Sequence, residues 1–181
     1  AHSRAAIKSM LTRYNRFMEI GDLESAEEYL LTDFEDQSEY ISAQRFNDNV
    51  ICVCRESSVR FFEKLVSEIE NMFLEANSVI KTFHVGGDEL PYGAWKKSPI
   101  CNDFLSSNSE VNSVEDLPVY FFIEIMKILN KKNISMAGWE DVLLLHSENA
   151  QNATKINTKF LGYNITPYVW NNVWGGGRED M

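Results

Sequence analysis

The sequence has little of what metal centres, nucleic-acid partners and membranes require. Its 181 residues include three histidines and three cysteines, and Cys52, Cys54 and Cys101 form no zinc pattern, because a structural zinc site needs four ligands. Acidic residues outnumber basic ones by 27 to 17, and a net charge of −10 argues against nucleic acid or anionic membranes as partners. No apolar run approaches the roughly 18 residues of a membrane helix. We therefore expect no metal, no nucleic acid and no membrane span in this segment.

The chain also has no initiator methionine and no visible signal peptide, because it opens directly with the helix-like AHSRAAIKSM. We therefore expect a piece of a longer protein. What it does have is a hydrophobic content of 44%, enough for one sizeable core, and aromatic residues at 12% with four tryptophans. Such ring surfaces serve either packing or ligand binding.

Hydrophobic periodicity predicts an alternation of helices and strands. Helices are expected over 4–20, 22–31, 58–76, 118–132 and briefly from 140, and buried strands over 79–85, 134–138 and from 166. Two long connections, 32–55 and 90–116, show no clear period. This order is typical of parallel strands joined by crossover helices, which predicts an α/β fold.

Acidic and aromatic residues follow three of these strands at the point where each ends. They are Asp88–Glu89, Trp139–Glu140–Asp141 and Trp170–Asn171. Because the carboxyl ends of parallel strands meet at one edge of the sheet, these residues are expected to converge there. Their convergence predicts a functional site.

Acids and tryptophans without a phosphate loop suit a neutral, hydroxyl-rich substrate. Tryptophan faces stack on sugar rings, and a protonated carboxyl can donate a proton to a glycosidic oxygen. Glycines before the acids let the backbone approach a ligand. The residues alone leave three alternatives open: a solvated acidic pair, tryptophans that belong to the core, and a sugar-binding module that performs no catalysis. His84 alone on a strand is more often an interior histidine than a metal ligand.

Several segments together resemble one family. FHVGGDE at 83–89 resembles the catalytic signature of the family-twenty glycoside hydrolases, the β-N-acetylhexosaminidases, and within them the bacterial chitobiase branch. HSRAA, AWKKSPIC, AGWED and YVWNNVWGGG resemble further segments of that family, in the same order along nearly the whole chain.

The resemblance implies a (β/α)8 TIM barrel forming a single catalytic domain. Residues 1–181 would cover it from about the third strand exit to the sixth, and sequence outside this chain would supply the remainder. The implied partner is an oligosaccharide containing N-acetylglucosamine, and no metal or organic cofactor is implied. The alternative is an N-acetylhexosamine-binding module, or an inactive fragment of such an enzyme.

The resemblance also implies a role for each site residue. Glu89 would be the general acid and base, and Asp88 would orient the 2-acetamido group of the substrate. That group would itself attack the anomeric carbon and form an oxazolinium intermediate, so that hydrolysis retains the configuration. The residues expected to line the sugar pocket are His2, His84, Trp139, Trp170 and Trp174.

Members of this family are usually periplasmic, secreted or associated with the outer membrane, where disulfides persist. A disulfide between Cys54 and Cys101 is therefore expected, with Cys52 as the free thiol. Cys54 precedes the long helix before the acid pair, and Cys101 lies in the connection after it. A helix that runs back along its strand can bring both cysteines to one rim.

Overall fold

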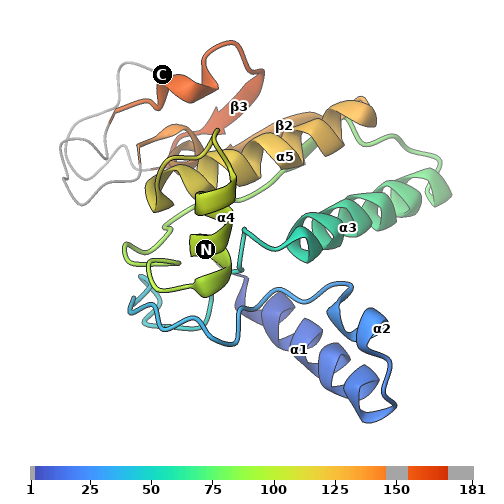
Figure 1. The fold of residues 1–181 in the computed structure, drawn as a ribbon. Coiled ribbons are helices and arrows are strands. Elements are labelled where there is room, and N and C mark those ends of the chain that lie inside the picture. The colour runs from blue at the N-terminus through green and yellow to red at the C-terminus, as the bar shows by residue number, and fades with distance from the viewer. Residues whose placement is uncertain (1–2, 146–154, 171–181) are drawn as a thin grey trace.

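The computed structural model describes residues 3–145 and 155–170, and it contains one sheet of three short parallel strands (Figure 1). They are β1 (Thr82–His84), β2 (Ser135–Trp139) and β3 (Ile165–Tyr168), in the order β1-β2-β3. Their register pairs Phe83 with Met136 and Met136 with Ile165. The predicted strands are therefore present, but β1 is shorter than the expected range of 79–85, and it is not buried as expected, because Thr82 and His84 face the open side of the sheet.

One face of the sheet packs on helices. α5 (Leu117–Lys131) lies against β2, and α3 (Glu56–Glu75) packs beside α5 (Figure 1). α5 is buried on most of its circumference because it lies between the sheet and other elements. The hydrophobic core includes Phe121, Ile125 and Leu129 of this helix together with Met136 of β2. Phe83 and Ile165 pack against the same core from the neighbouring strands.

The opposite face of the sheet carries the alternate residues of each strand. Thr82, His84, Thr166 and Tyr168 are all exposed, while their neighbours Phe83 and Ile165 are partly buried. This alternation follows the period of two in a strand. The sheet therefore presents an open face, with its polar and aromatic side chains directed away from α5.

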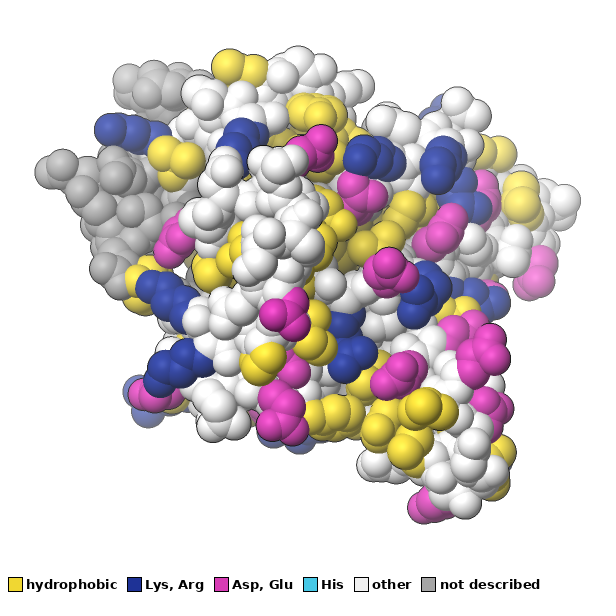
Figure 2. Space-filling view, in the orientation of Figure 1, with side chains coloured by type: hydrophobic (Ala, Val, Ile, Leu, Met, Phe, Trp, Pro, Cys, Tyr) yellow, Lys and Arg dark blue, Asp and Glu magenta, His cyan; other side chains and the backbone are white. Residues whose placement is uncertain are grey.

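α1 (Arg4–Glu19) and α2 (Leu23–Glu27) form a helical pair below the sheet in Figure 1. The Asp22 side chain caps α2 by accepting a hydrogen bond from Ser25 N at 3.0 Å, and this bond lowers the pKa of Asp22. α2 is shorter than the helix expected over 22–31. On the face shown in Figure 2, acidic and basic side chains are interspersed, and hydrophobic side chains gather over these two helices. No helix among the described residues is long and apolar enough to cross a membrane.

The expectation of a long loop over 90–116 is wrong in part. α4 (Pro99–Ser107) and a 3-10 helix (Val114–Asp116) lie within it. Ser98 starts α4 because its side chain accepts a hydrogen bond from Cys101 N at 3.1 Å, and Pro99 supplies a favourable first residue. The other long connection, 32–55, contains no helix or strand. After β2 the chain forms a 3-10 helix (Glu140–Leu143) at the start of the short helix expected from residue 140.

Candidate active site

The acid pair follows a turn formed by two glycines with left-handed backbone conformations. Gly86 and Gly87 have φ of +76° and +95°, in the left-handed region that side chains disfavour. A Cβ on Gly87 would overlap Cγ2 of Val142 and lie 3.1 Å from the Phe122 ring. The Gly86 carbonyl also accepts a hydrogen bond from Trp139 N at 2.9 Å. The turn is thus fixed against the end of β2 and against the helical layer.

An aromatic cluster lies on the open face of the sheet, formed by one ring from each strand. The His84 ring is 4.9 Å from the Trp139 ring and 4.9 Å from the Tyr168 ring, and both contacts are edge-on. The Trp139 and Tyr168 rings are 6.3 Å apart. The structure thus brings two predicted site residues together and adds Tyr168, which the sequence analysis missed. Its position two residues before Trp170 could have placed it on the same strand face.

Trp170 lies at the end of β3 with 43% of its surface exposed. Its indole Nε1 donates a hydrogen bond to Asp141 Oδ2 at 2.8 Å. Glu140, the residue before Asp141, is fully buried at 0% exposure. Residues at the exits of β2 and β3 are therefore joined to each other, as expected for strands whose ends share one edge.

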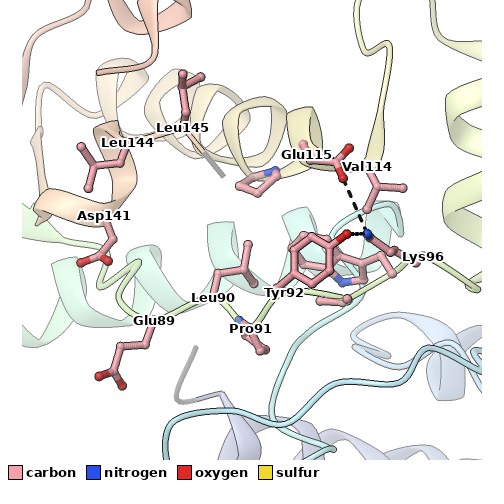
Figure 3. A pocket seen from close by; sticks show the side chains of 14 residues that line it. Glu89, Leu90, Pro91, Tyr92, Lys96, Val114, Glu115, Asp141, Leu144 and Leu145 are labelled. Atoms are coloured by element: carbon pink, nitrogen blue, oxygen red, sulfur yellow. Dashed lines mark hydrogen bonds and ion pairs between the residues drawn. The ribbon is translucent and has the colours of Figure 1, made fainter. Parts of the chain in front are cut away.

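A pocket of about 240 Å³ begins beside the acid pair (Figure 3). Glu89 and Asp141 lie on one side of it, and Tyr92, Lys96 and Glu115 lie on the other. The Lys96 ammonium is 3.7 Å from the centre of the Tyr92 ring, donates a hydrogen bond to the Tyr92 hydroxyl, and lies 4.0 Å from Glu115. The pocket therefore has Glu89 and Asp141 on one side, with the Glu89 carboxyl pointing away from Tyr92, and the Lys96–Tyr92 pair with Glu115 on the other (Figure 3).

Glu89 is half-buried, and its backbone has φ of +48°, which is uncommon for a residue with a side chain. Its Oε2 accepts a hydrogen bond from Gln44 Nε2 at 2.6 Å. Asp88 is half-buried beside it. Gln44 belongs to the long connection 32–55, and nothing in the sequence pattern singled it out.

The two long connections are bonded to each other. We call residues 33–54 and 91–101 together the loop unit. Ser98 Oγ donates to Asp33 Oδ2 at 2.7 Å, Lys97 N donates to Ser38 Oγ at 2.8 Å, and Trp95 Nε1 donates to the Ile51 carbonyl at 2.8 Å. Asp33 and Ser98 are both buried. These bonds join segments about 45 to 65 residues apart in the chain.

A disulfide between Cys54 and Cys101 closes the loop unit, with the two Cα atoms 5.2 Å apart. These are the cysteines that the sequence analysis paired. Cys52 is a free, buried thiol 3.9 Å from Cys101 Sγ. Burial raises the pKa of the Cys52 thiol to about 11.

The structure therefore gathers Asp88, Glu89, His84, Trp139 and Trp170 along one edge and one face of the sheet. Two further predicted site residues, His2 and Trp174, lie outside the described residues. Within the described ranges 3–145 and 155–170, no group of three or more His, Cys, Asp or Glu side chains could hold a metal ion.

Comparison with known proteins gives a single family. The catalytic-domain model of glycosyl hydrolase family 20 matches residues 1–175. The chain is 37% identical over 179 residues to a β-hexosaminidase of Vibrio vulnificus, covering 98% of this chain and 20% of that protein. It is 32% identical to an N,N′-diacetylchitobiase of Vibrio harveyi, and the match covers 97% of this chain and 22% of that protein.

A solved structure of the same family also matches this chain. The family 20 exo-β-N-acetylglucosaminidase of Vibrio harveyi, crystallised in complex with N-acetylglucosamine, superimposes with a TM-score of 0.61 at 28% identity. The match covers 82% of this chain and 20% of that protein. The chain thus spans about a fifth of the length of these relatives.

Proposed function

Because the chain belongs to glycosyl hydrolase family 20, a family of TIM-barrel catalytic domains, we propose that the protein carrying it is a β-N-acetylhexosaminidase. It removes terminal non-reducing N-acetylglucosamine from chitobiose, chito-oligosaccharides or glycans. The described residues are a partial α/β segment, and we assign them to the barrel from the third strand exit to the sixth. The remainder of the barrel comes from sequence beyond this chain.

The observation that carries the proposal is the shared edge of the sheet. Asp88 and Glu89 leave β1 through a glycine turn that is hydrogen-bonded to the end of β2. The rings of His84, Trp139 and Tyr168 form one cluster on the open face of the same strands. Carboxyls beside exposed rings are the side chains that a glycosidase needs for proton transfer and for sugar stacking.

In the proposed reaction the substrate supplies the nucleophile. Glu89 donates its proton to the glycosidic oxygen while the carbonyl oxygen of the 2-acetamido group attacks the anomeric carbon. The leaving sugar departs, and an oxazolinium intermediate remains. Glu89, now a carboxylate, takes a proton from water as that water attacks the anomeric carbon and displaces the acetamido oxygen, which restores the 2-acetamido group, and the configuration is retained. Glu89 thereby ends in its starting protonation state.

Asp88 has a separate role in this proposal. As a carboxylate it accepts a hydrogen bond from the acetamido N–H and stabilises the positive charge that develops on the oxazolinium ring. A fixed charge aimed at a developing charge is among the strongest contributions to catalysis. Adjacent side chains diverge, so that one residue can face the acetamido group while its neighbour faces the glycosidic oxygen.

The aromatic cluster supplies the walls of the sugar site. Trp139 and Tyr168 offer ring surface on the open face, and Trp170 is held at the rim by Asp141. His84 lies between the first two rings, where it positions them. Trp174 and His2 complete the proposed lining. The relative solved with N-acetylglucosamine supports this choice of sugar.

We also propose that the protein is exported, to the periplasm, the medium or the outer membrane. The Cys54–Cys101 disulfide supports this location because disulfides persist mainly in oxidising compartments.

The decisive experiment is the Glu89→Gln variant of the full-length protein, assayed on chitobiose. The amide cannot donate the catalytic proton, so the turnover number should fall about 100-fold or more while substrate still binds. Near-normal turnover would refute the assignment of the acid. A wild-type protein that binds N-acetylglucosamine but hydrolyses neither chitobiose nor an aryl N-acetylglucosaminide would be a binding module.

A second variant, Asp88→Asn, tests the role of the acetamido group. Loss of the charge should lower the turnover number about 100-fold or more. A thiazoline analogue of the oxazolinium ion should inhibit the wild type tightly and this variant weakly. Equal inhibition of both proteins would remove Asp88 from the mechanism.

A further inference from the structure

Glu89 has a hydrogen-bond partner that comes from a distant part of the chain. The amide of Gln44, 45 residues earlier, donates to Glu89 Oε2 at 2.6 Å. The backbone of Glu89 has φ of +48°, a conformation that persists only where surrounding contacts hold it. The hydrogen bond from the Gln44 amide to the Glu89 carboxyl is one such contact.

A closed turn presents Gln44 to the acid. Ser42 N donates to the Phe46 carbonyl at 2.8 Å, and Arg45 N donates to the Ser42 carbonyl at 2.8 Å. The buried Ser42 hydroxyl also accepts a hydrogen bond from Phe46 N at 3.1 Å. The Arg4 guanidinium lies 4.3 Å above the Phe46 ring and holds the outside of the turn. Gln44 thus projects from a turn whose two ends are bonded to each other.

The base of this turn is packed on the segment that follows Glu89. A Cβ added to Gly93 would lie 2.5 Å from the Glu39 carbonyl oxygen, so the two backbones are in direct contact there. The same two segments are also joined by a hydrogen bond from Lys97 N to Ser38 Oγ at 2.8 Å. The donor Gln44 and the acceptor Glu89 are therefore carried by two segments that are fixed to each other on the same side of the molecule.

We propose that Gln44 is a positioning residue for Glu89. Its amide N–H holds one carboxyl oxygen, Oε2, and so fixes the orientation in which Glu89 transfers its proton to the glycosidic oxygen. The inference rests on the proposed function of Glu89 as acid and base.

A neutral donor suits this task. The amide can donate to a carboxylate oxygen before and after proton transfer, because the carbonyl oxygen of a protonated carboxyl also accepts. A lysine at this position would favour only the carboxylate. Gln44 therefore keeps its partner while Glu89 gives up its proton and later recovers it.

The test uses Gln44→Met in the full-length protein, because methionine keeps the length of the side chain and removes the donor. Substrates are chitobiose, whose leaving sugar needs a proton, and a dinitrophenyl N-acetylglucosaminide, whose leaving group does not. We expect kcat on chitobiose to fall about 10-fold or more and kcat on the aryl substrate to change less than about threefold. KM and the melting temperature should stay close to those of the wild type.

The matched control is Gln37→Met, the same substitution in the same connection. Gln37 is exposed, and its backbone N–H donates a hydrogen bond to the Lys97 carbonyl at 3.4 Å. The control should behave as wild type on both substrates. An equal loss of kcat on both substrates in Gln44→Met would show a general structural role and overturn the inference. A rise in KM alone would make Gln44 a substrate contact and would overturn it too.

The Glu89→Gln variant separates this inference from the proposed function. If Glu89→Gln hydrolyses chitobiose normally, the acid assignment fails and the positioning role fails with it. If Glu89→Gln is inactive and Gln44→Met is normal on chitobiose, the proposed function stands and only the positioning role is refuted.

Discussion

The sheet and the loop unit meet at Glu89, but they are held together by different kinds of bonding. In the sheet, neighbouring strands pair backbone to backbone, with Phe83 opposite Met136 and Trp139 opposite Tyr168. In the loop unit, single side chains such as Asp33, Ser38 and Trp95 join two irregular segments, and a disulfide closes them.

This difference determines how strongly the stability of each region depends on a single side chain. A strand ladder repeats the same bond at every step, so the exchange of one side chain for a similar one leaves the pairing intact. The loop unit has no such repeat, so each of its side-chain hydrogen bonds depends on one particular residue. We therefore expect the loop unit to depend on individual side chains and the sheet to depend on its backbone turns.

The largest expected effect is removal of the disulfide with Cys54→Ala and Cys101→Ala in the full-length protein. The bond spans 47 residues, for which the chain-entropy model gives a loss of about 4 kcal/mol in the free energy of unfolding. Hydrogen exchange should show loss of protection first in the loop unit, for example at Cys52 N and Lys97 N. Equal loss at the β2 amides would contradict the comparison.

Gly87→Ala tests the backbone turn at the sheet edge. The added methyl group would occupy the space of Val142 Cγ2 and also demand a left-handed φ. We expect a loss of about 3 kcal/mol in the free energy of unfolding. Gly86→Ala is the matched control, because its Cβ meets nothing closer than 3.7 Å and only the cost of φ, about 1 kcal/mol, remains. Equal losses in urea denaturation would rule out the steric explanation.

Ser98→Ala removes a side chain that makes two hydrogen bonds in the loop unit. Its hydroxyl donates to the buried Asp33 and accepts from Cys101 N at the start of α4. We expect a loss of about 1–2 kcal/mol. Ser106→Ala on the same helix serves as the control, because its hydroxyl bonds only the exposed Asn102 carbonyl, and it should change stability by less than about 0.5 kcal/mol. Similar melting temperatures for the two variants would argue against the buried network.

Near neutral pH the smallest expected effect concerns Cys52, because its thiol is protonated there in both the native and the unfolded chain. Because burial raises the pKa of this thiol to about 11, the native protein should hold it protonated and react slowly with iodoacetamide at pH 8. An unfolded chain loses this proton near the ordinary value of 9.0, so the native state should lose stability as the pH rises from 9 toward 11. Mass spectrometry after timed alkylation measures the reaction. Rapid labelling at pH 8 without unfolding would show that the thiol is accessible.

The same contrast explains what the sequence could predict. Strands and their exits were predictable because their apolar runs end abruptly at glycines, acids and tryptophans, and this located the acid pair, Trp139 and Trp170. Tyr168 was missed although its spacing from Trp170 carried the signal. α4 was missed because its nine residues are too few to show a clear helical period, and Cys101 is the one among them that is fully buried.

Gln44 lay beyond prediction for a different reason. Its contact with Glu89 depends on a turn closed by Ser42 and Phe46 and on the packing of Gly93 against the Glu39 carbonyl. None of these features has a period or a composition that marks it in advance. The roles of all the predicted site residues stay predictions, and His2 and Trp174 also lie outside the described residues.

The packing of Gly93 on the Glu39 carbonyl has a consequence for how such proteins can diverge. Two surface connections usually gain and lose residues independently of each other. Here an insertion between Asp33 and Gln44 would shift Glu39 away from Gly93 and move the amide away from the acid, unless the segment after Glu89 changed length to match. The lengths of these two segments should therefore vary together among active homologues. A change of length in one segment should be accompanied by a matching change in the other.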